Sequence, residues 1–254
     1  MTRTPAVTAN RLDEAFRRGR PVLVCYLPIG DPLAAHADAA VYLDQGVDVL
    51  EVGVPGADSS LDGPVIAGSM RRARAHGMNN SSAARFIRAF RERLGDPATV
   101  WMTYPSAAAE PGWITDVTES HVDGTLIAGA APGDHSTPPG VRQVGFLPHH
   151  PTNAQLAAAA AATGYVLVAA HDGVSGARTG ISPENRALLD RVRASGVTAP
   201  LTLGFGIADG DGARAAVACG ADGIVVGSAV VAAAMDSGAA LRAILQELRK
   251  AVDE

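Results

Sequence analysis

The chain has 254 residues, of which 47% are hydrophobic, 19% charged and only 4% aromatic. A formal net charge of −5 and the lack of a basic run argue against nucleic acid or an anionic membrane as a partner, and the few aromatic residues argue against a stacking surface for single-stranded nucleic acid. Two cysteines, Cys25 and Cys219, are too few for a disulfide framework and suggest a reducing, cytoplasmic environment. The first twenty residues lack the apolar stretch of a secretory signal, and no apolar run is long enough to predict a membrane span.

Short apolar runs alternate along the chain with longer helical patterns. Eight runs have the length of buried strands: Val22–Ile29, Val47–Val54, Thr99–Tyr104, Val122–Ala128, Gln143–Leu147, Tyr165–Ala170, Leu201–Leu203 and Gly223–Val226. These runs are continuously apolar, which is typical of parallel strands buried on both faces. Eight strand–helix units in about 250 residues predict an α/β protein with one domain, residues 1–254, folded as a (β/α)8 TIM barrel.

Helical patterns lie between these strands, and one more precedes the first strand. The predicted helices are Arg11–Arg18, Ala34–Gln45, Val65–Ala75, Ala83–Leu94, Trp113–Ser120, Asn153–Thr163, a helix with Ser182 as its N-cap, Asp211–Ala218 and a closing helix Ala229–Ala251. The segment Pro132–Gly140, between the fourth and fifth strands, holds three prolines and two glycines. Proline and glycine disfavour a helix interior, so the fourth helix is expected to be short or broken.

Two carboxyl groups, one in the second predicted strand and one in the loop after it, are candidates for catalysis. Glu51 lies within that strand, where a charge is costly to bury, so it is either paired with a buried arginine or is a carboxyl group whose pKa burial raises for proton transfer. Asp62 ends the following loop and could either cap the next helix or serve as a second catalytic carboxylate. Asp58, in the same loop, is a third candidate.

Glycine-rich turns follow the last three strands. Gly204-Phe205-Gly206 and Gly227-Ser228 follow strands seven and eight, where barrels of this type bind phosphate through backbone N–H groups and a helix N-terminus. They predict a small phosphorylated substrate. The loop His171–Gly180, after strand six, has the glycine content of a mobile lid. No histidine or cysteine spacing typical of a metal site occurs, so no metal is expected.

Six motifs together resemble the tryptophan synthase alpha chain family over nearly the whole chain. They are Ile29-Gly30-Asp31-Pro32, Leu50-Glu51-Val52-Gly53-Val54-Pro55, Asp62-Gly63-Pro64, Gly173-Val174-Ser175-Gly176, Gly204-Phe205-Gly206-Ile207 and Gly227-Ser228-Ala229. The resemblance implies a lyase without a cofactor, which cleaves indole-3-glycerol phosphate into indole and glyceraldehyde 3-phosphate by a retro-aldol reaction. It also implies a tryptophan synthase beta chain as a possible partner.

The resemblance assigns a role to each matching position. Glu51 would be the acid–base catalyst, and Asp62 would hold the indole N–H and stabilise the protonated ring. The positions implied to bind phosphate are Gly176, Gly206, Gly227 and Ser228. Those implied to line the substrate pocket are Tyr26, Met102, Tyr104 and Phe205, together with Ser175, which stands where the family has a lid threonine.

The chain departs from the family mainly where the family contacts its partner. The loop Gly56–Leu61 lacks the family's Phe and Pro, Pro105-Ser106 replace Ala-Asn, and Leu167 stands in place of a strand-six tyrosine. Three hypotheses therefore stay open. The chain is a lyase, with or without a beta chain; or a non-catalytic ligand-binding activator of a beta-type partner; or an enzyme acting on another phosphorylated substrate.

Overall fold

A computed structural model describes residues 10–58, 61–176 and 180–254. Three predicted features therefore lie partly outside the described residues: the N-terminal segment, Ser59 and Ser60 of the loop after the second strand, and residues 177–179 of the predicted lid.

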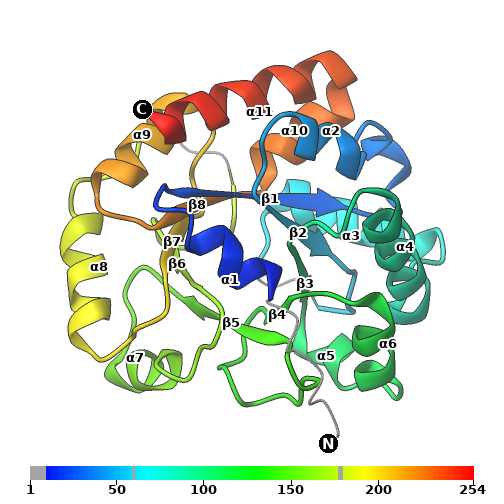
Figure 1. Ribbon diagram of the computed structural model, residues 1–254, viewed down its shortest axis with the longest axis horizontal. Coiled ribbons are helices and arrows are strands. Elements are labelled where there is room, and N and C mark those ends of the chain that lie inside the picture. The colour runs from blue at the N-terminus through cyan, green and yellow to red at the C-terminus, as the bar shows by residue number, and fades with distance from the viewer. Residues whose placement is uncertain (1–9, 59–60, 177–179) are drawn as a thin grey trace, which may run out of the picture.

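Eight parallel strands close into a barrel in sequence order (Figure 1). They are β1 Val22–Pro28, β2 Val49–Gly53, β3 Thr99–Thr103, β4 Gly124–Ile127, β5 Arg142–Leu147, β6 Val166–Ala169, β7 Leu201–Gly204 and β8 Gly223–Val226. The last strand pairs with the first, with Val22 in register with Gly223, so no strand edge is left open. The predicted TIM-barrel fold is confirmed.

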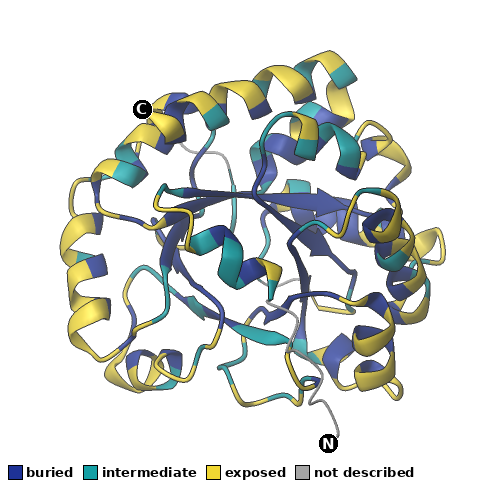
Figure 2. Cartoon of the chain, viewed as in Figure 1, coloured by how far each residue is buried: buried dark blue, intermediate teal, exposed yellow. Residues whose placement is uncertain are grey.

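Helices surround the barrel on the outside and are exposed on their outer faces (Figure 2). They are α2 Ala39–Asp44, α3 Pro64–Ala75, α4 Asn80–Arg93, α5 Pro105–Ala108, α6 Trp113–Ser120, α7 Asn153–Ala159, α8 Asn185–Ala194, α9 Gly210–Ala218, α10 Ser228–Asp236 and α11 Gly238–Asp253, with a 3-10 turn, η1, at Pro32–Ala34. Among the described residues no helix is long and apolar enough to cross a membrane. As predicted, the described residues between β4 and β5 form no helix.

The predicted N-terminal helix, α1 Arg11–Phe16, crosses one end of the barrel (Figure 1). Its Leu12 packs beside Gly124, the first residue of β4. The Phe16 ring lies 5.5 Å from that of Tyr165, the residue just before β6. The helix therefore covers the end of the barrel where the strands begin, and the other end stays available for a site.

Several predicted helix boundaries are wrong: the helix predicted from Ala83 begins at Asn80, that predicted to end at Thr163 ends at Ala159, and two more begin later than the apolar pattern indicates because of local capping groups. The helix predicted from Ala34 begins at Ala39, after the 3-10 turn, because the Asp38 side chain accepts the N–H of Ala40. The helix predicted to follow Ser182 begins at Asn185; Ser182 Oγ instead accepts the N–H of Glu184 in the preceding turn.

The predicted closing helix is two helices, α10 and α11, that break at Ser237. Ser237 has an extended backbone with φ −165° and ψ 161°, and its side chain accepts the N–H of Ala240 to cap α11. Its own N–H still donates to Ala233 O and so closes α10. One residue thus ends one helix and begins the next, which separates α10 at the barrel end from α11 on the barrel side.

Alternation along the strands divides the core into two parts. In β2, Leu50 and Val52 belong to the cluster between barrel and helices, whereas Val49 belongs to the cluster inside the barrel. Because side chains alternate along a strand, Glu51 points to the same side as Val49, into the barrel. In the same way Tyr26, Met102 and Leu167 lie in the inner cluster. The barrel interior is therefore a layered apolar core with one carboxyl group in it.

Three aspartates at the beginnings of strands bind the backbone of the strand before. Asp48 Oδ2 accepts the N–H of Leu23 at 3.0 Å, Asp123 Oδ2 that of Thr99 at 2.9 Å, and Asp222 Oδ2 that of Leu201 at 2.7 Å. Each of these carboxylates also pairs with arginine. They fasten β1 to β2, β3 to β4 and β7 to β8 at the end of the barrel that α1 covers.

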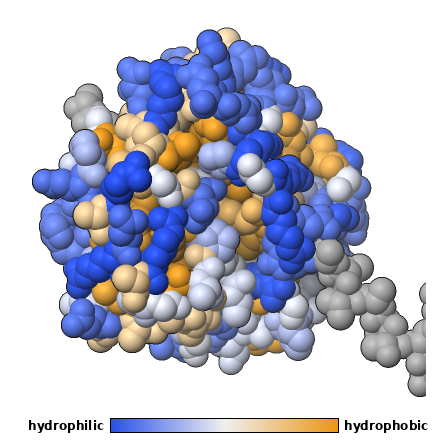
Figure 3. Space-filling view, turned by 60° about the vertical axis from the view of Figure 1, so that its left-hand side comes forward, coloured by the Kyte–Doolittle hydropathy of each residue, from blue (hydrophilic) through white to orange (hydrophobic). Residues whose placement is uncertain are grey.

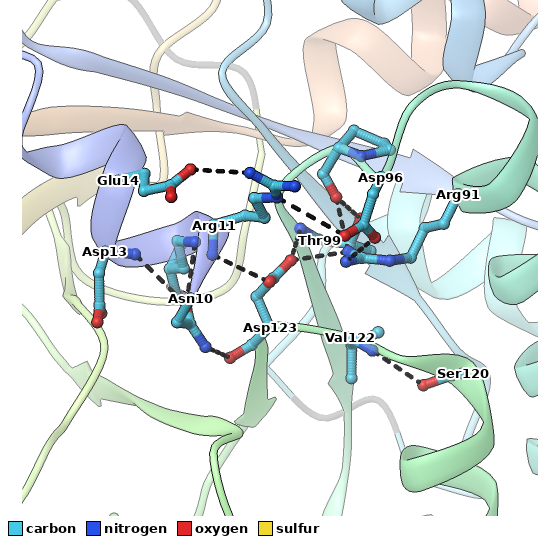
Figure 4. A network of polar contacts seen from close by, with 12 residues as sticks. Asn10, Arg11, Asp13, Glu14, Arg91, Asp96, Thr99, Ser120, Val122 and Asp123 are labelled. Atoms are coloured by element: carbon cyan, nitrogen blue, oxygen red, sulfur yellow. Dashed lines mark hydrogen bonds and ion pairs between the residues drawn. The ribbon is translucent and has the colours of Figure 1, made fainter. Parts of the chain in front are cut away.

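The Asp123 network joins α1, α4 and two strands (Figure 4). Asp123 accepts from Arg91 Nη1 at 2.7 Å and from the N–H of Arg11 at 3.2 Å, while Asn10 donates to the Asp123 carbonyl at 2.8 Å. Arg91 is only 3% exposed and also donates to Pro97 O.

On the face of the molecule drawn in Figure 3, hydrophobic residues gather between groups of hydrophilic ones.

Candidate active site

A largely apolar pocket opens at the end of the barrel where the strands finish. Its empty volume, including space open to solvent, is about 620 Å³. All eleven residues that sequence analysis assigns to the site line it: Tyr26, Glu51, Asp62, Met102, Tyr104, Ser175, Gly176, Phe205, Gly206, Gly227 and Ser228. Six of the eight strands, with the loops that follow them, thus bring the predicted site residues to one place. Asp58 is not among the lining residues.

Glu51 is 4% exposed, and its Oε2 accepts a hydrogen bond of 2.7 Å from the hydroxyl of Tyr165. Burial raises the pKa of Glu51 to about 7; the Tyr165 hydroxyl opposes this rise and the charge of Asp62 adds to it. The alternative of a buried arginine pair is wrong, because the hydrogen-bond partner is a tyrosine. A carboxyl group with a pKa near neutrality can both release and accept a proton.

Asp62 lies at the end of the loop after β2, beside Ser175 of the loop after β6. Burial raises its pKa to about 6, and the hydroxyl groups of Tyr104 and Ser175 limit this rise. Asp62 does not cap α3, since Gly63 is the N-cap residue and no side chain caps that helix. Its Oδ1 accepts from Ser175 Oγ at 3.3 Å, whereas its buried Oδ2 has no hydrogen-bond partner among the described residues. The Tyr104 hydroxyl, which acts on the Asp62 carboxyl group, also forms no hydrogen bond of normal distance and angle with a described residue, so Oδ2 can still accept a hydrogen bond from a ligand.

The turns after β7 and β8 form a second polar part of the pocket. Ser228 is the first residue of α10, a nine-residue helix, and its buried Oγ has no partner among the described residues. Gly206 has φ +118°, which is accessible to glycine alone. Phe205 has φ +63°, a conformation that is costly for a bulky residue. Free backbone N–H groups at a helix N-terminus and an unpaired hydroxyl are suited to an anion such as phosphate.

Apolar and aromatic side chains form the rest of the wall. Phe205 packs on Phe146 with ring centroids 5.5 Å apart, and both line the pocket. Leu126, Leu167 and Val225 add aliphatic surface from β4, β6 and β8. A flat apolar group that carries one hydrogen-bond donor would fill this space and reach Asp62.

Tyr165 is a site residue that sequence analysis missed. It stands one residue before β6, two positions before Leu167, so alternation turns both side chains into the barrel. Its place at the beginning of the strand gave no sign of a functional role. The hydroxyl nonetheless reaches Glu51, whereas Leu167, at the position where the family has tyrosine, lines the pocket with aliphatic surface.

The Gly30-Asp31-Pro32 motif lies outside the pocket lining and is joined to helix α3 by an ion pair. The buried Asp31 carboxylate accepts hydrogen bonds from Arg72 Nε at 2.8 Å and from Arg72 Nη2 at 2.7 Å. Arg72 belongs to α3, which begins directly after Asp62 and Gly63. This ion pair fixes the loop after β1 to the helix that follows the second carboxylate. Among the described residues, no cluster of three or more His, Cys, Asp or Glu side chains could hold a metal ion.

The fold and site define a (β/α)8-barrel protein with a carboxylate pair and the N-terminus of helix α10 in one apolar pocket. Residues 12–254 match the tryptophan synthase alpha chain family, and the chain belongs to that family. The tryptophan synthase alpha chain of Halorhodospira halophila is 32% identical, over 96% of this chain and 97% of the relative. That of Streptomyces avermitilis is also 32% identical, over 96% and 94%.

Solved structures agree with this assignment. The tryptophan synthase of Mycobacterium tuberculosis superposes with a TM-score of 0.81 at 28% identity, covering 97% of this chain and 98% of the other. A chain of the tryptophan synthase α2β2 complex from Pyrococcus furiosus, described as showing mutual activation, superposes with a TM-score of 0.77 at 26% identity, covering 91% and 98%.

Proposed function

We propose that the chain is a carbon–carbon lyase that cleaves indole-3-glycerol phosphate into indole and glyceraldehyde 3-phosphate. The observation that carries the proposal is the pocket itself. One apolar pocket holds Glu51 with a pKa of about 7, the free Oδ2 of Asp62, and the unpaired Ser228 hydroxyl at the N-terminus of α10. An aromatic ring with an N–H donor and a phosphate group is the ligand that uses all three.

In this reaction the bond between indole C3 and the adjacent side-chain carbon breaks. Glu51 delivers a proton to C3 of the ring and takes up the proton of the side-chain hydroxyl, whose oxygen becomes the aldehyde carbonyl. Asp62 accepts the indole N–H through Oδ2 and stabilises the positive charge that protonation puts on the ring. Gly176, Gly206, Gly227 and Ser228 hold the phosphate. Protons and electrons balance without a cofactor.

The test is steady-state cleavage by the purified chain, with indole and glyceraldehyde 3-phosphate measured separately. We expect both products in equal amounts. Glu51→Gln removes the proton carrier and should lower kcat by about 10²–10⁴-fold, the usual contribution of a general acid–base group. Asp62→Asn should lower kcat by about 10²–10³-fold, the range for loss of one electrostatic partner of a transition state.

Asp58→Asn is the matched control, because Asp58 shares the loop but not the pocket lining. Its kcat should stay within about threefold of the unchanged protein. The proposal fails if the purified chain forms no indole, alone or with a beta chain. Activation of a beta chain that survives Glu51→Gln would instead support a non-catalytic activator, and preferential thermal stabilisation by another sugar phosphate would support a different substrate.

We further propose that the chain works with a tryptophan synthase beta chain. The structural neighbour from Pyrococcus furiosus belongs to an α2β2 complex, which supports this assignment. In this chain the loop after β2 binds back onto its own barrel, since Ser106 Oγ accepts the N–H of Ala57 at 3.3 Å. Size-exclusion chromatography with a purified beta chain tests the association, and two separate peaks at micromolar concentration would contradict it.

A further inference from the structure

The loops after β2 and β6 meet at Gly63. The N–H of Ser175 donates to Leu61 O at 3.0 Å, and the N–H of Gly63 donates to Ser175 Oγ at 3.0 Å. Ser175 Oγ in turn lies 3.3 Å from Asp62 Oδ1. Ser175 is therefore held by three consecutive residues of the opposite loop, one of which is the carboxylate of the proposed site.

This contact leaves no space for a side chain at position 63. A Cβ atom on Gly63 would lie 1.9 Å from the carbonyl oxygen of Ser175 and 3.0 Å from its carbonyl carbon. The obstructing atoms belong to the backbone, so they cannot move aside as the end of a flexible side chain can. To restore a contact of 3.0 Å, the Ser175 carbonyl would have to retreat by about 1.1 Å, the difference between 3.0 and 1.9 Å.

The backbone of Gly63 does not itself require glycine. Its φ of −71° and ψ of 173° are extended and suit any residue that precedes a proline. Gly63 is also the N-cap of α3 and supplies no capping side chain, although Ser, Thr, Asp or Asn is favoured at that position. Local conformation and helix capping thus both permit a side chain, and only the approach of Ser175 forbids one.

We propose that Gly63 is a positioning residue for the lid loop: the lack of a Cβ forms the seat in which Ser175 docks against Asp62. Ser175 lines the pocket next to Gly176, so its position sets the shape of this part of the pocket wall. A shift of about 1 Å at a site of this kind can cost about a hundredfold in rate. The kinetic consequence rests on the proposed lyase function, whereas the seat itself does not.

The experiment compares Gly63→Ala with the unchanged protein by hydrogen–deuterium exchange, without ligand. We expect the Ser175 amide to exchange at least about tenfold faster in Gly63→Ala, because its bond to Leu61 O is lost when the carbonyl is displaced. Thermal unfolding should stay within about 2 °C of the unchanged protein. Gly238→Ala is the matched control: it also lies at a helix N-terminus, its nearest neighbour is the Arg242 side chain at 3.4 Å, and it should leave Ser175 exchange unaltered.

Steady-state kinetics of the same variants provide a second test. With indole-3-glycerol phosphate, kcat for Gly63→Ala should fall about 30- to 100-fold and KM should change less than about fivefold, because the pocket residues outside the loop after β6 keep their places. Gly63→Ser should behave like Gly63→Ala, although it offers α3 a better cap. Unaltered exchange at Ser175 would overturn the proposal, as would general unfolding of Gly63→Ala. Faster exchange in a protein that never forms indole would leave the seat standing and refute only the lyase function.

Discussion

A buried carboxyl group, Glu51, and a half-buried one, Asp62, share one pocket and repel each other, so they take different charges near neutral pH. The pKa of Asp62 rises to about 6 and that of Glu51 to about 7, in part because of the charge on Asp62. At pH 7 Asp62 is therefore mostly ionised, while Glu51 is close to half protonated. This difference suits a division in which Asp62 binds a positive ring and Glu51 exchanges the proton.

Tyr165 should tune the pKa of Glu51. Its hydroxyl donates to Oε2 and favours the ionised carboxylate, so Tyr165→Phe removes this stabilisation and raises the pKa of Glu51 above about 7. We expect the limb of the pH–rate profile that reports Glu51 to move to higher pH, with the measurement being kcat/KM between pH 5 and 9.

Phe16→Leu controls for loss of packing around Tyr165. The centre of the Phe16 ring lies 5.5 Å from that of the Tyr165 ring. A phenyl ring cannot donate a hydrogen bond to Glu51, so this substitution changes the packing around Tyr165 without removing a hydrogen bond. Its pH–rate profile should keep the original midpoint. An unmoved limb in Tyr165→Phe would show that another group titrates in this range.

Glu51 should also make stability depend on pH. The folded protein keeps the Glu51 proton up to about pH 7, whereas the unfolded chain releases it near pH 4.5. Stability therefore falls as pH rises through this window. The shift of about 2.5 pH units corresponds to about 3 kcal/mol at 1.36 kcal/mol per unit. Urea unfolding of Glu51→Gln and of the unchanged protein measures this effect. The free energy of unfolding of Glu51→Gln, relative to that of the unchanged protein, should increase by about 3 kcal/mol between pH 4.5 and 8. A difference between the two proteins that stays constant over this range would contradict the prediction.

At the level of elements, single capping residues decide where helices begin. Ser237 interrupts an alanine-rich pattern that reads as one long helix, because its hydroxyl caps α11. Ser237→Ala should lower the free energy of unfolding by about 1 kcal/mol, the usual cost of losing an N-cap. Ser237→Asn keeps a capping oxygen and should cost only a few tenths of a kcal/mol. Equal losses for both, measured by urea unfolding, would mean that the cap contributes nothing.

The strand order, the two carboxyl groups and the glycine-rich turns could be found from local pattern in the sequence, whereas the remaining pocket positions, such as Tyr26 and Met102, were assigned by resemblance to a family. Apolar runs mark the strands, and a barrel brings every strand end to one rim, so Glu51 and Gly227 meet without any knowledge of their contacts. Tyr165 could not be assigned a role, since its hydrogen bond to Glu51 joins residues 114 positions apart. Whether Asp62 caps α3 likewise depends on how the loop after β6 docks, which no local pattern records.

At the scale of the whole molecule, stability and chemistry lie at opposite ends of the barrel. The pocket uses the ends of the strands, whereas Asp48, Asp123 and Asp222 fasten strands together where they begin. The three aspartates share a sequence pattern: each follows an apolar residue and stands directly before the first residue of a strand. Its meaning is visible only once each carboxylate is seen to bind the backbone of the preceding strand. Substitutions at this end should alter stability and leave the pocket chemistry intact.

Asp123 should be the most costly of these aspartates to remove. Its carboxylate and Arg91 are almost fully buried, with side-chain exposures of 9% and 4%. Asp123→Ala leaves the N–H of Thr99 without its partner and leaves the buried guanidinium of Arg91 with only Pro97 O and the half-exposed Asp96. Breaking a buried ion pair costs about 3–5 kcal/mol when the remaining charge has no other partner, and because Asp96 still pairs with Arg91 we expect a loss of about 3 kcal/mol. Asp222→Ala is the comparison, because Asp222 and its arginine are 47% and 40% exposed, and it should cost about 1–2 kcal/mol, mainly for the lost hydrogen bond to Leu201. In both variants the kcat of the protein that remains folded should be unchanged. Equal losses of unfolding free energy in Asp123→Ala and Asp222→Ala would show that burial of the ion pair with Arg91 adds nothing to stability.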